Sequence, residues 1–260
     1  MDRPWLQQEI IVWDPLTGQQ HHVSFPAGLQ NGKGRNSNNW RAAVLRVDPE
    51  DAHIHGGCFS SLFKLILICN VGTHIFACVY ESTSAAWGNI VSLSSTGRIC
   101  RTRPDVLVGN ALCWLLSGGD VLAFDLESQH LGVTEKPADA HIVHCCQGYV
   151  QILRTQDSGL GLAVLSKHNI QFWERKSNTD NVAGWVRLQK TIQFELFPLI
   201  NRNLLIMGYD EDSNVIVLST RIGCFTVQLD SMQIRHIIER NWMCYNTLYP
   251  YKNFYTAGNT

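Results

Sequence analysis

Side chains that commonly bind metal ions occur close together at two places in this sequence. His53 and His55 are two residues apart, and His141 to Cys146 reads His-Ile-Val-His-Cys-Cys. A zinc site needs ligands that converge on one point, and on an extended strand His144 and Cys145 point to opposite faces. The two histidines at 53 and 55 have no evident third ligand. We therefore expect no metal and no cofactor, and interpret both stretches as loop or strand residues.

Two sequence patterns that would indicate an enzyme, a phosphate-binding loop and a hydrolase nucleophile motif, are not met by this sequence. Gly28 to Gly34 reads Gly-Leu-Gln-Asn-Gly-Lys-Gly, whereas a phosphate-binding loop needs four residues between its glycines and Ser or Thr after the lysine. No Gly-x-Ser-x-Gly segment is present to carry a hydrolase nucleophile. The sequence therefore predicts a protein that is not an enzyme.

One aromatic–cation pair is a candidate for contact with another molecule. Trp40 and Arg41 follow the Gly- and Asn-rich residues 27–39, which we expect to form a flexible loop. Tryptophan and arginine are enriched among the residues that dominate protein interfaces. We therefore predict that Trp40 and Arg41 bind a partner.

Acidic residues recur at the ends of short apolar runs, usually directly after an aromatic residue. In pairs they could be mistaken for catalytic carboxylates, but their periodic placement favours capping of turns by the acid side chain. Successive acids are 44 to 67 residues apart, and a four-stranded propeller blade takes about 40–50 residues. The five acids are Asp14, Glu81, Asp125, Glu174 and Asp230.

The clearest secondary-structure pattern in the sequence lies between Asn110 and Gly132. Two apolar runs, Ala111 to Leu116 and Val121 to Phe124, are each too short for a typical helix. Ser-Gly-Gly-Asp at 117–120 supplies the turn, since glycine adopts positive φ angles without strain. The segment predicts a β-hairpin with Phe124 buried on an inner strand.

The same order of strand, turn, strand with aromatic and acid, and turn recurs along the chain. Inner runs are continuously apolar and outer runs are more polar, as expected for blades packed around an axis. We predict an all-β fold, a β-propeller of four-stranded antiparallel blades. The alternative that also explains many short strands is a β-sandwich, and the repeated order favours the propeller. Four sets of strands begin at Trp40, Val106, Tyr149 and Leu204.

Composition restricts the partners and the compartment. Apolar residues make up 45% of the 260 residues, charged residues 17%, and the formal net charge is −1. No global field therefore attracts nucleic acid or an anionic membrane. The nine cysteines show no Cys-x-x-Cys spacing and mostly lie in apolar runs, which fits buried free thiols in a reducing compartment. We expect a cytoplasmic or nuclear protein without a signal peptide or membrane span.

Taken in order, these motifs resemble the F-box-associated β-propeller domain of plant F-box proteins, especially those abundant in grasses. That resemblance implies a kelch-like propeller that recruits a protein substrate to a cullin-based ubiquitin ligase of the SCF type. The matching stretches are Ile11 to Gly18, Gly109 to Trp114 with Leu122 to Asp125, Gly208 to Asn214, and Tyr249 to Tyr255.

The family carries a helical F-box before the propeller, and this chain shows no such segment, so we expect a truncated product. Binding of a Skp-type adaptor and cullin then requires that an F-box be supplied. We expect a single domain over residues 1–260, with residues 1–26 as a partial first blade and 247–260 as a tail. A propeller that binds a small ligand or catalyses a reaction, and a non-functional fragment, remain alternatives.

The N-terminal set has only two strands, so we predict four full blades plus a partial fifth. Its strand around Ile10 to Val12 would then seal imperfectly against the C-terminal blade, leaving the ring incompletely closed. An unsealed apolar strand exposes backbone N–H and C=O groups and promotes association.

Overall fold

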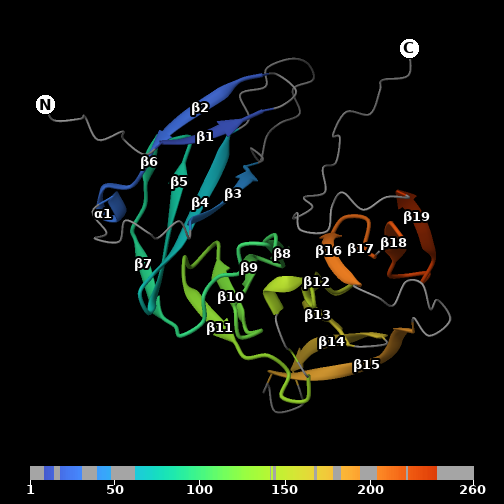
Figure 1. The fold of residues 1–260 in the computed structure, drawn as a ribbon. Coiled ribbons are helices and arrows are strands. Elements are labelled where there is room, and N and C mark those ends of the chain that lie inside the picture. The colour runs from blue at the N-terminus through green and yellow to red at the C-terminus, as the bar shows by residue number, and fades with distance from the viewer. Residues whose placement is uncertain are drawn as a thin grey trace, which may run out of the picture. The chain divides into compact units, whose positions relative to one another are not determined.

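The computed structural model describes residues 9–14, 18–30, 40–47, 62–140, 142, 145–166, 169–177, 183–193, 204–220 and 222–238. These residues are almost entirely β-structure, which confirms the predicted all-β class (Figure 1). The chain divides into two compact units, Met1–Thr96 and Gly97–Thr260. No helix within the described ranges is long and apolar enough to cross a membrane.

The first unit contains a two-stranded ribbon and a larger antiparallel sheet. The sheet order is β3-β4-β5-β6, and β7 also pairs with β5, so the outer strand is interrupted between β6 and β7. The elements are β1 (Glu9–Trp13), β2 (Gln20–Ser24), α1 (Ala27–Gln30), β3 (Trp40–Arg46), β4 (Phe63–Val71), β5 (His74–Glu81), β6 (Ala86–Trp87) and β7 (Val91–Ser94).

Strand β4 forms the centre of this unit because nearly all of its side chains are apolar. Leu65 to Ile68 are at most 1% exposed, so both faces of the strand are covered. Gly72, with φ of +62°, makes the turn into β5. The pairing of Val71 with His74 leaves two residues in this hairpin turn.

The second unit contains three sheets, each a four-stranded antiparallel meander (Figure 1). The sheet orders are β8-β9-β10-β11, β12-β13-β14-β15 and β16-β17-β18-β19. One apolar core, which includes Val106, Ile152 and Ile206 of the first strand of each sheet, joins all three. The strands are β8 (Val106–Val108), β9 (Ala111–Leu115), β10 (Val121–Asp125), β11 (Leu131–Thr134), β12 (Val150–Arg154), β13 (Leu160–Leu165), β14 (Asn169–Ser177), β15 (Ala183–Gln193), β16 (Leu205–Asp210), β17 (Val215–Ser219), β18 (Cys224–Gln228) and β19 (Ile234–Ile238).

These sheets confirm the predicted propeller blades. The sets expected from Trp40, Val106, Tyr149 and Leu204 each become one sheet, and the N-terminal set contributes only β1 and β2. The fold is a β-propeller of four full blades and a partial one.

The predicted hairpin is present as β9 and β10, with Leu122 opposite Trp114 and Phe124 opposite Leu112. Gly119, with φ of +95°, occupies the turn position that demands a positive φ angle. Phe124 is fully buried, as expected. The expectation that Phe124 lies on an inner strand is wrong, because β10 is the third strand of its sheet. The strand that packs toward β12 is β8.

The recurring acids mark the third strand of each blade. Glu81 ends β5, Asp125 ends β10, Glu174 lies in β14, and Asp230 follows β18 by two residues. Asp14 directly follows β1, just as the other acids end or follow the third strand of their blades. By this comparison β1 corresponds to the third strand of a blade and β2 to the fourth. The ribbon therefore corresponds to the outer half of a blade.

The ribbon has an exposed apolar face. Ile11 and Trp13 on β1 are 55% and 59% exposed, and the residues opposite them on β2 are His22 and Gln20. Within the described ranges, β1 pairs with β2 alone. The prediction that the ring is incompletely closed depends on whether β1 pairs with residues 247–257. Those residues lie outside the described part of the chain, so this remains a prediction.

We therefore expect the isolated chain to self-associate through this ribbon as its concentration increases. Light scattering over a concentration series should show a rising mean mass. The substitution Trp13→Lys should suppress it, whereas Val186→Lys, at an exposed residue of β15, should not. A stable monomer at all concentrations, with Ile10 to Val12 amides protected from hydrogen exchange, would show that the ring closes.

One predicted loop contains a short helix. Residues 27–39 were expected to be a flexible loop, but Ala27–Gln30 forms the helical turn α1, with the Leu29 amide donating to the Pro26 carbonyl at 3.0 Å. Pro26 fixes the backbone φ angle at the start of this turn, which favours helix initiation. Residues 31–39 lie outside the described part.

Candidate functional site

The predicted pair Trp40 and Arg41 begins strand β3. The Trp40 ring meets the Phe25 ring edge-on, with centroids 5.0 Å apart, and both Trp40 and Arg41 are partly exposed. Successive side chains of a strand point to opposite faces, so the two residues do not form one contact patch. A role in partner binding remains a prediction for each of them.

Trp87 and Trp185 connect neighbouring sheets through their indole N–H groups. Trp87 donates to the Ser24 carbonyl at 2.8 Å and connects β6 to the ribbon strand β2. Trp185 donates to the Glu135 carbonyl at 2.6 Å and connects β15 to the residue following β11. Both rings are partly buried and therefore support neighbouring sheets.

Among the recurring acids, Asp125 caps a turn as the capping interpretation predicts. One carboxylate oxygen of Asp125 accepts hydrogen bonds from the Glu127 amide, the Ser128 amide and the Ser128 hydroxyl at 2.7 to 3.1 Å. These donors lower the pKa of Asp125, most strongly through the Ser128 amide. The two glutamates instead form ion pairs, Glu81 with Lys64 at 3.3 Å and Glu174 with Lys176 at 2.9 Å.

A polar network, here called the turn network, joins the three blades of the second unit where β12 and β16 end. The Glu211 carboxylate accepts from the Leu107 amide of β8 at 3.1 Å. Arg154, at the end of β12, donates to the Glu211 carbonyl at 2.7 Å and lies 3.8 Å from the Asp212 carboxylate. The hydroxyl of Tyr209 donates to the Arg154 carbonyl at 3.1 Å. The end of β12 and the turn after β16 are therefore held against each other and against strand β8.

Asp230 extends the turn network to strand β18. Its carboxylate accepts from the Asn214 amide group at 2.7 Å, the Gln156 amide group at 3.3 Å and the Gln228 amide group at 3.4 Å. Gln228 also donates to the Ser213 carbonyl at 2.7 Å. These contacts fix the turn after β12 against the turn after β16.

Burial raises the pKa of Glu211, and the nearby Arg154 charge and the Leu107 amide oppose this change. The ionised carboxylate is therefore disfavoured in the folded chain relative to the unfolded chain. The contribution of Glu211 to stability should then decrease as pH rises from the ordinary glutamate value of 4.5 through the folded-state value.

The substitution Glu211→Gln should remove this pH dependence. The free energy of unfolding of the variant, measured by denaturant titration, should rise relative to the native chain as pH increases across this window, and then stay level. Asp157→Asn, at an exposed acid beside the network, is the matched control. A native-to-variant difference that is constant with pH would contradict the assignment.

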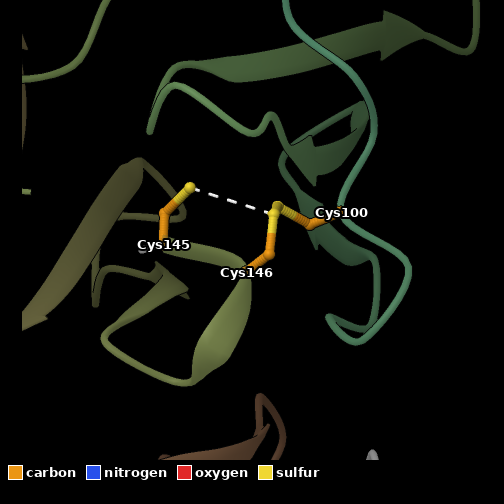
Figure 2. A group of neighbouring side chains, drawn as sticks. All are labelled: Cys100, Cys145 and Cys146. Carbon is orange, nitrogen blue, oxygen red and sulfur yellow. Dashed lines mark hydrogen bonds between the residues drawn. A yellow bond between two sulfur atoms is a disulfide. The ribbon is translucent and has the colours of Figure 1, made fainter. Parts of the chain in front are cut away.

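For Cys100 and Cys146, the structure corrects the expectation of free thiols. Cys100 and Cys146 form a disulfide with Cα atoms 5.2 Å apart (Figure 2). Cys100 is close to Cys146 because the Ile99–Leu116 bridge positions the chain before β8, and the 3₁₀ helix η1 (Cys145–Gln147) precedes β12. A sequence separation of 46 residues gives no local signal for this pairing.

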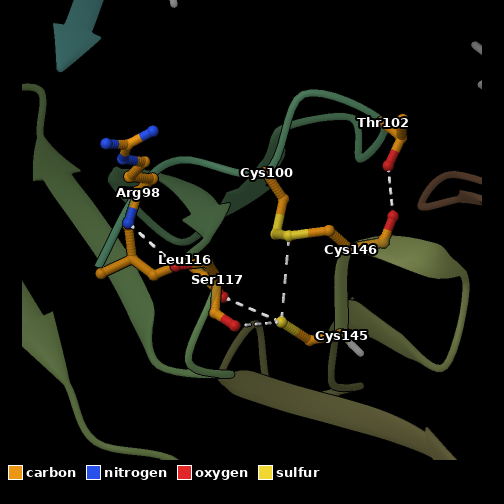
Figure 3. The surroundings of a disulfide bond; sticks show 7 residues. All are labelled: Arg98, Cys100, Thr102, Leu116, Ser117, Cys145 and Cys146. Atoms are coloured by element: carbon orange, nitrogen blue, oxygen red, sulfur yellow. Dashed lines mark hydrogen bonds between the residues drawn. A yellow bond between two sulfur atoms is a disulfide. The ribbon is translucent and has the colours of Figure 1, made fainter. Parts of the chain in front are cut away.

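The third cysteine of this group, Cys145, points toward the same place. Its thiol donates to the Ser117 carbonyl at 2.9 Å and to the Leu116 carbonyl at 3.2 Å, and its sulfur lies 3.9 Å from that of Cys146 (Figure 3). The Thr102 hydroxyl donates to the Cys146 carbonyl. Within the described ranges the free cysteines Cys69, Cys78, Cys113, Cys145 and Cys224 are buried.

A buried arginine supports this end of the second unit. Arg103 is 6% exposed and donates to the Ile206 carbonyl of β16 at 2.5 Å. Burial lowers its pKa to about 10, so the guanidinium remains charged at neutral pH. Gly148 is required beside it, because its φ is +100° and a Cβ there would lie 3.2 Å from the same carbonyl oxygen.

Several candidates from the sequence lie outside the described residues: His53, His55, His141, His144 and the Gly-Lys pair at 32–33. The expectation of no metal at these positions is therefore untested. Sequence reasoning missed the turn network and the Cys100 contact. The Gly-Tyr-Asp-Glu-Asp-Ser-Asn segment at 208–214 was noticed as a family motif, and that was the available signal for the turn network.

A family model described as "F-box protein AT5G49610-like, beta-propeller" matches residues 6–251. No curated protein matches the chain. Among solved structures, the crystal structure of HIRA(644–1017) aligns with 78% of this chain and 55% of that chain, at 11% identity and a TM-score of 0.29.

Proposed function

Because the chain belongs to the F-box protein AT5G49610-like β-propeller family, we propose that it recognises a protein substrate for a cullin-based ubiquitin ligase of the SCF type. It acts by binding and has no catalytic activity. Its partner is a protein of the cytoplasm or nucleus.

The observation that carries this proposal is the turn network. Loops on a rigid scaffold are the usual place for binding residues. Here hydrogen bonds that involve Glu211, Arg154 and Asp230 hold the turns of two blades together and connect them to strand β8 of a third. Such preorganisation reduces the entropy lost when a partner is bound. The turns therefore present a surface that is already shaped.

The charge of this surface indicates the chemistry of the partner. The turn network and its immediate surroundings contain five acidic residues and one arginine, Arg154. The ligand complementary to this charge is a basic segment of the substrate. The acids are Asp157, Asp210, Glu211, Asp212 and Asp230. Asp157, Asp212 and Asp230 are exposed, and the Asp230 carboxylate already accepts hydrogen bonds from three side-chain amide groups.

Affinity purification with matched charge-reversal variants tests this proposal. The double variant Asp157→Lys/Asp212→Lys should lose proteins that the native chain retains, whereas Glu135→Lys should keep them. Glu135 is exposed, and its carbonyl rather than its side chain accepts the Trp185 hydrogen bond. A further variant, Trp40→Ala/Arg41→Ala, tests the pair predicted from sequence. Identical sets of bound proteins for the native chain and the Asp157/Asp212 variant would refute binding at the turn network.

The 260-residue polypeptide by itself should not bind the Skp-type adaptor. Helices within the described ranges are α1 and η1, each a single turn, whereas the F-box that holds the adaptor is helical. Co-precipitation of purified components should detect adaptor only when a helical F-box is fused before residue 1. Direct and robust binding of the unfused chain would disprove this expectation.

A further inference from the structure

The three sulfur atoms of Cys100, Cys145 and Cys146 have no part in partner recognition, yet they lie within 4.8 Å of one another (Figure 2). We propose that, once the Cys100–Cys146 disulfide is reduced, these three cysteines bind a thiophilic metal ion of the Zn²⁺ class. The inference takes from the proposed function only the reducing compartment, where disulfides are rare.

The geometry of the cluster suits thiolate ligation. In a tetrahedral zinc site with Zn–S bonds of about 2.3 Å, neighbouring sulfurs are about 3.8 Å apart, and the Cys145 and Cys146 sulfurs are already 3.9 Å apart. Opening the disulfide lets the Cys100 sulfur move away from Cys146 to a similar distance. The three ligands come from two segments, the chain before β8 and the helix η1. They converge on one point, because their sulfur atoms lie within 4.8 Å of one another.

The surroundings of the cluster balance its negative charge. Lys136 interacts electrostatically with Cys145. The buried guanidinium of Arg103 also interacts electrostatically with Cys145. Cys100 and Cys145 are buried and Cys146 is half-buried, so the metal ion would enter past Cys146. A water molecule can occupy the fourth position, as in sites with three protein ligands.

The chemistry balances with a thiol reductant. The reductant supplies two electrons and two protons to the Cys100–Cys146 bond, giving two thiols, and is itself oxidised to a disulfide. A divalent metal ion then displaces the protons of the three thiols to solvent as the metal–sulfur bonds form.

Titration of the reduced chain with Co²⁺, followed by displacement with Zn²⁺, tests the site. A phosphine reductant opens the disulfide and is then removed without oxygen. We expect a thiolate-to-metal charge-transfer band that saturates near one Co²⁺ per chain and disappears when Zn²⁺ is added. The oxidised chain should show no such band, because two of its three sulfurs are then bonded to each other.

Substitution identifies the ligands. Cys100→Ser, Cys145→Ser and Cys146→Ser should each weaken Co²⁺ binding by at least about 10-fold, whereas Cys224→Ser, at a buried thiol of β18, should not. All variants are compared after reduction, so none differs through loss of the disulfide. Circular dichroism should show that the metal-free reduced chain keeps its β-structure.

Three results would overturn the proposal. They are absence of the charge-transfer band in the reduced native chain, binding unaffected by all three substitutions, and loss of β-structure on reduction before metal is added. The first two results do not bear on partner binding by the turn network, so the two proposals fail separately.

Discussion

Phe124→Ala is expected to lower the free energy of unfolding by roughly 3–5 kcal/mol, the usual effect of removing a large aromatic side chain from a core. Phe124 is fully buried on β10, between Leu112 of β9 and Leu131 of β11. The substitution both forfeits the burial of the ring and leaves a cavity that a rigid sheet cannot close. Since domains are typically stable by about 5–15 kcal/mol, the second unit would be severely weakened.

The measurement is denaturant unfolding followed by tryptophan fluorescence and circular dichroism. Val133→Ala is the matched control, because Val133 belongs to the adjacent strand β11, opposite Leu122, and is 41% exposed. The control should change the free energy of unfolding by less than about 1 kcal/mol. A change that small for Phe124→Ala would mean that its ring is not in the core.

Reduction of the Cys100–Cys146 disulfide is expected to cost roughly 4 kcal/mol of stability. The bond closes a loop with a sequence separation of 46 residues, and cross-linking a loop of that length restricts the unfolded chain to about this extent. The loop contains the whole sheet β8-β9-β10-β11. The bond also connects the chain before β8 to the helix η1 that leads into β12.

Thermal melts with and without a reductant, both with a metal chelator, measure this effect. Cys100→Ser should melt like the reduced native chain and show no further response to reductant. Cys145→Ser should retain the response, because Cys145 is outside the bond. Equal melting temperatures for the oxidised and reduced native chain would show that the disulfide does not stabilise the fold.

Local features of the sequence were sufficient to predict the blades. The apolar runs around Ser117 to Asp120 specify the β9–β10 hairpin, because strand periodicity and turn chemistry act over a few residues. Asp125 was likewise correctly assigned to a turn, as the three hydrogen bonds to its carboxylate show, whereas Glu81 and Glu174 form ion pairs. The hydrogen bonds to Asp125 depend on neighbours in sequence and need no knowledge of the rest of the fold.

The candidate sites required the tertiary structure. Glu211 meets the Leu107 amide across 104 residues, and Arg103 meets the Ile206 carbonyl across 103. No periodicity predicts these contacts, because they depend on how one blade packs against the next. For the same reason the sequence left Cys100 as a buried free thiol, although it lies beside Cys146.

The sequence by itself therefore determined the class of fold, the order of the blades and the turn role of Asp125, because each follows from short-range backbone geometry and burial. Only the tertiary structure decided which turns share the network of Glu211, Arg154 and Asp230, and which three cysteines meet. Those arrangements are set by side chains that interlock between sheets, and their positions along the chain are far apart.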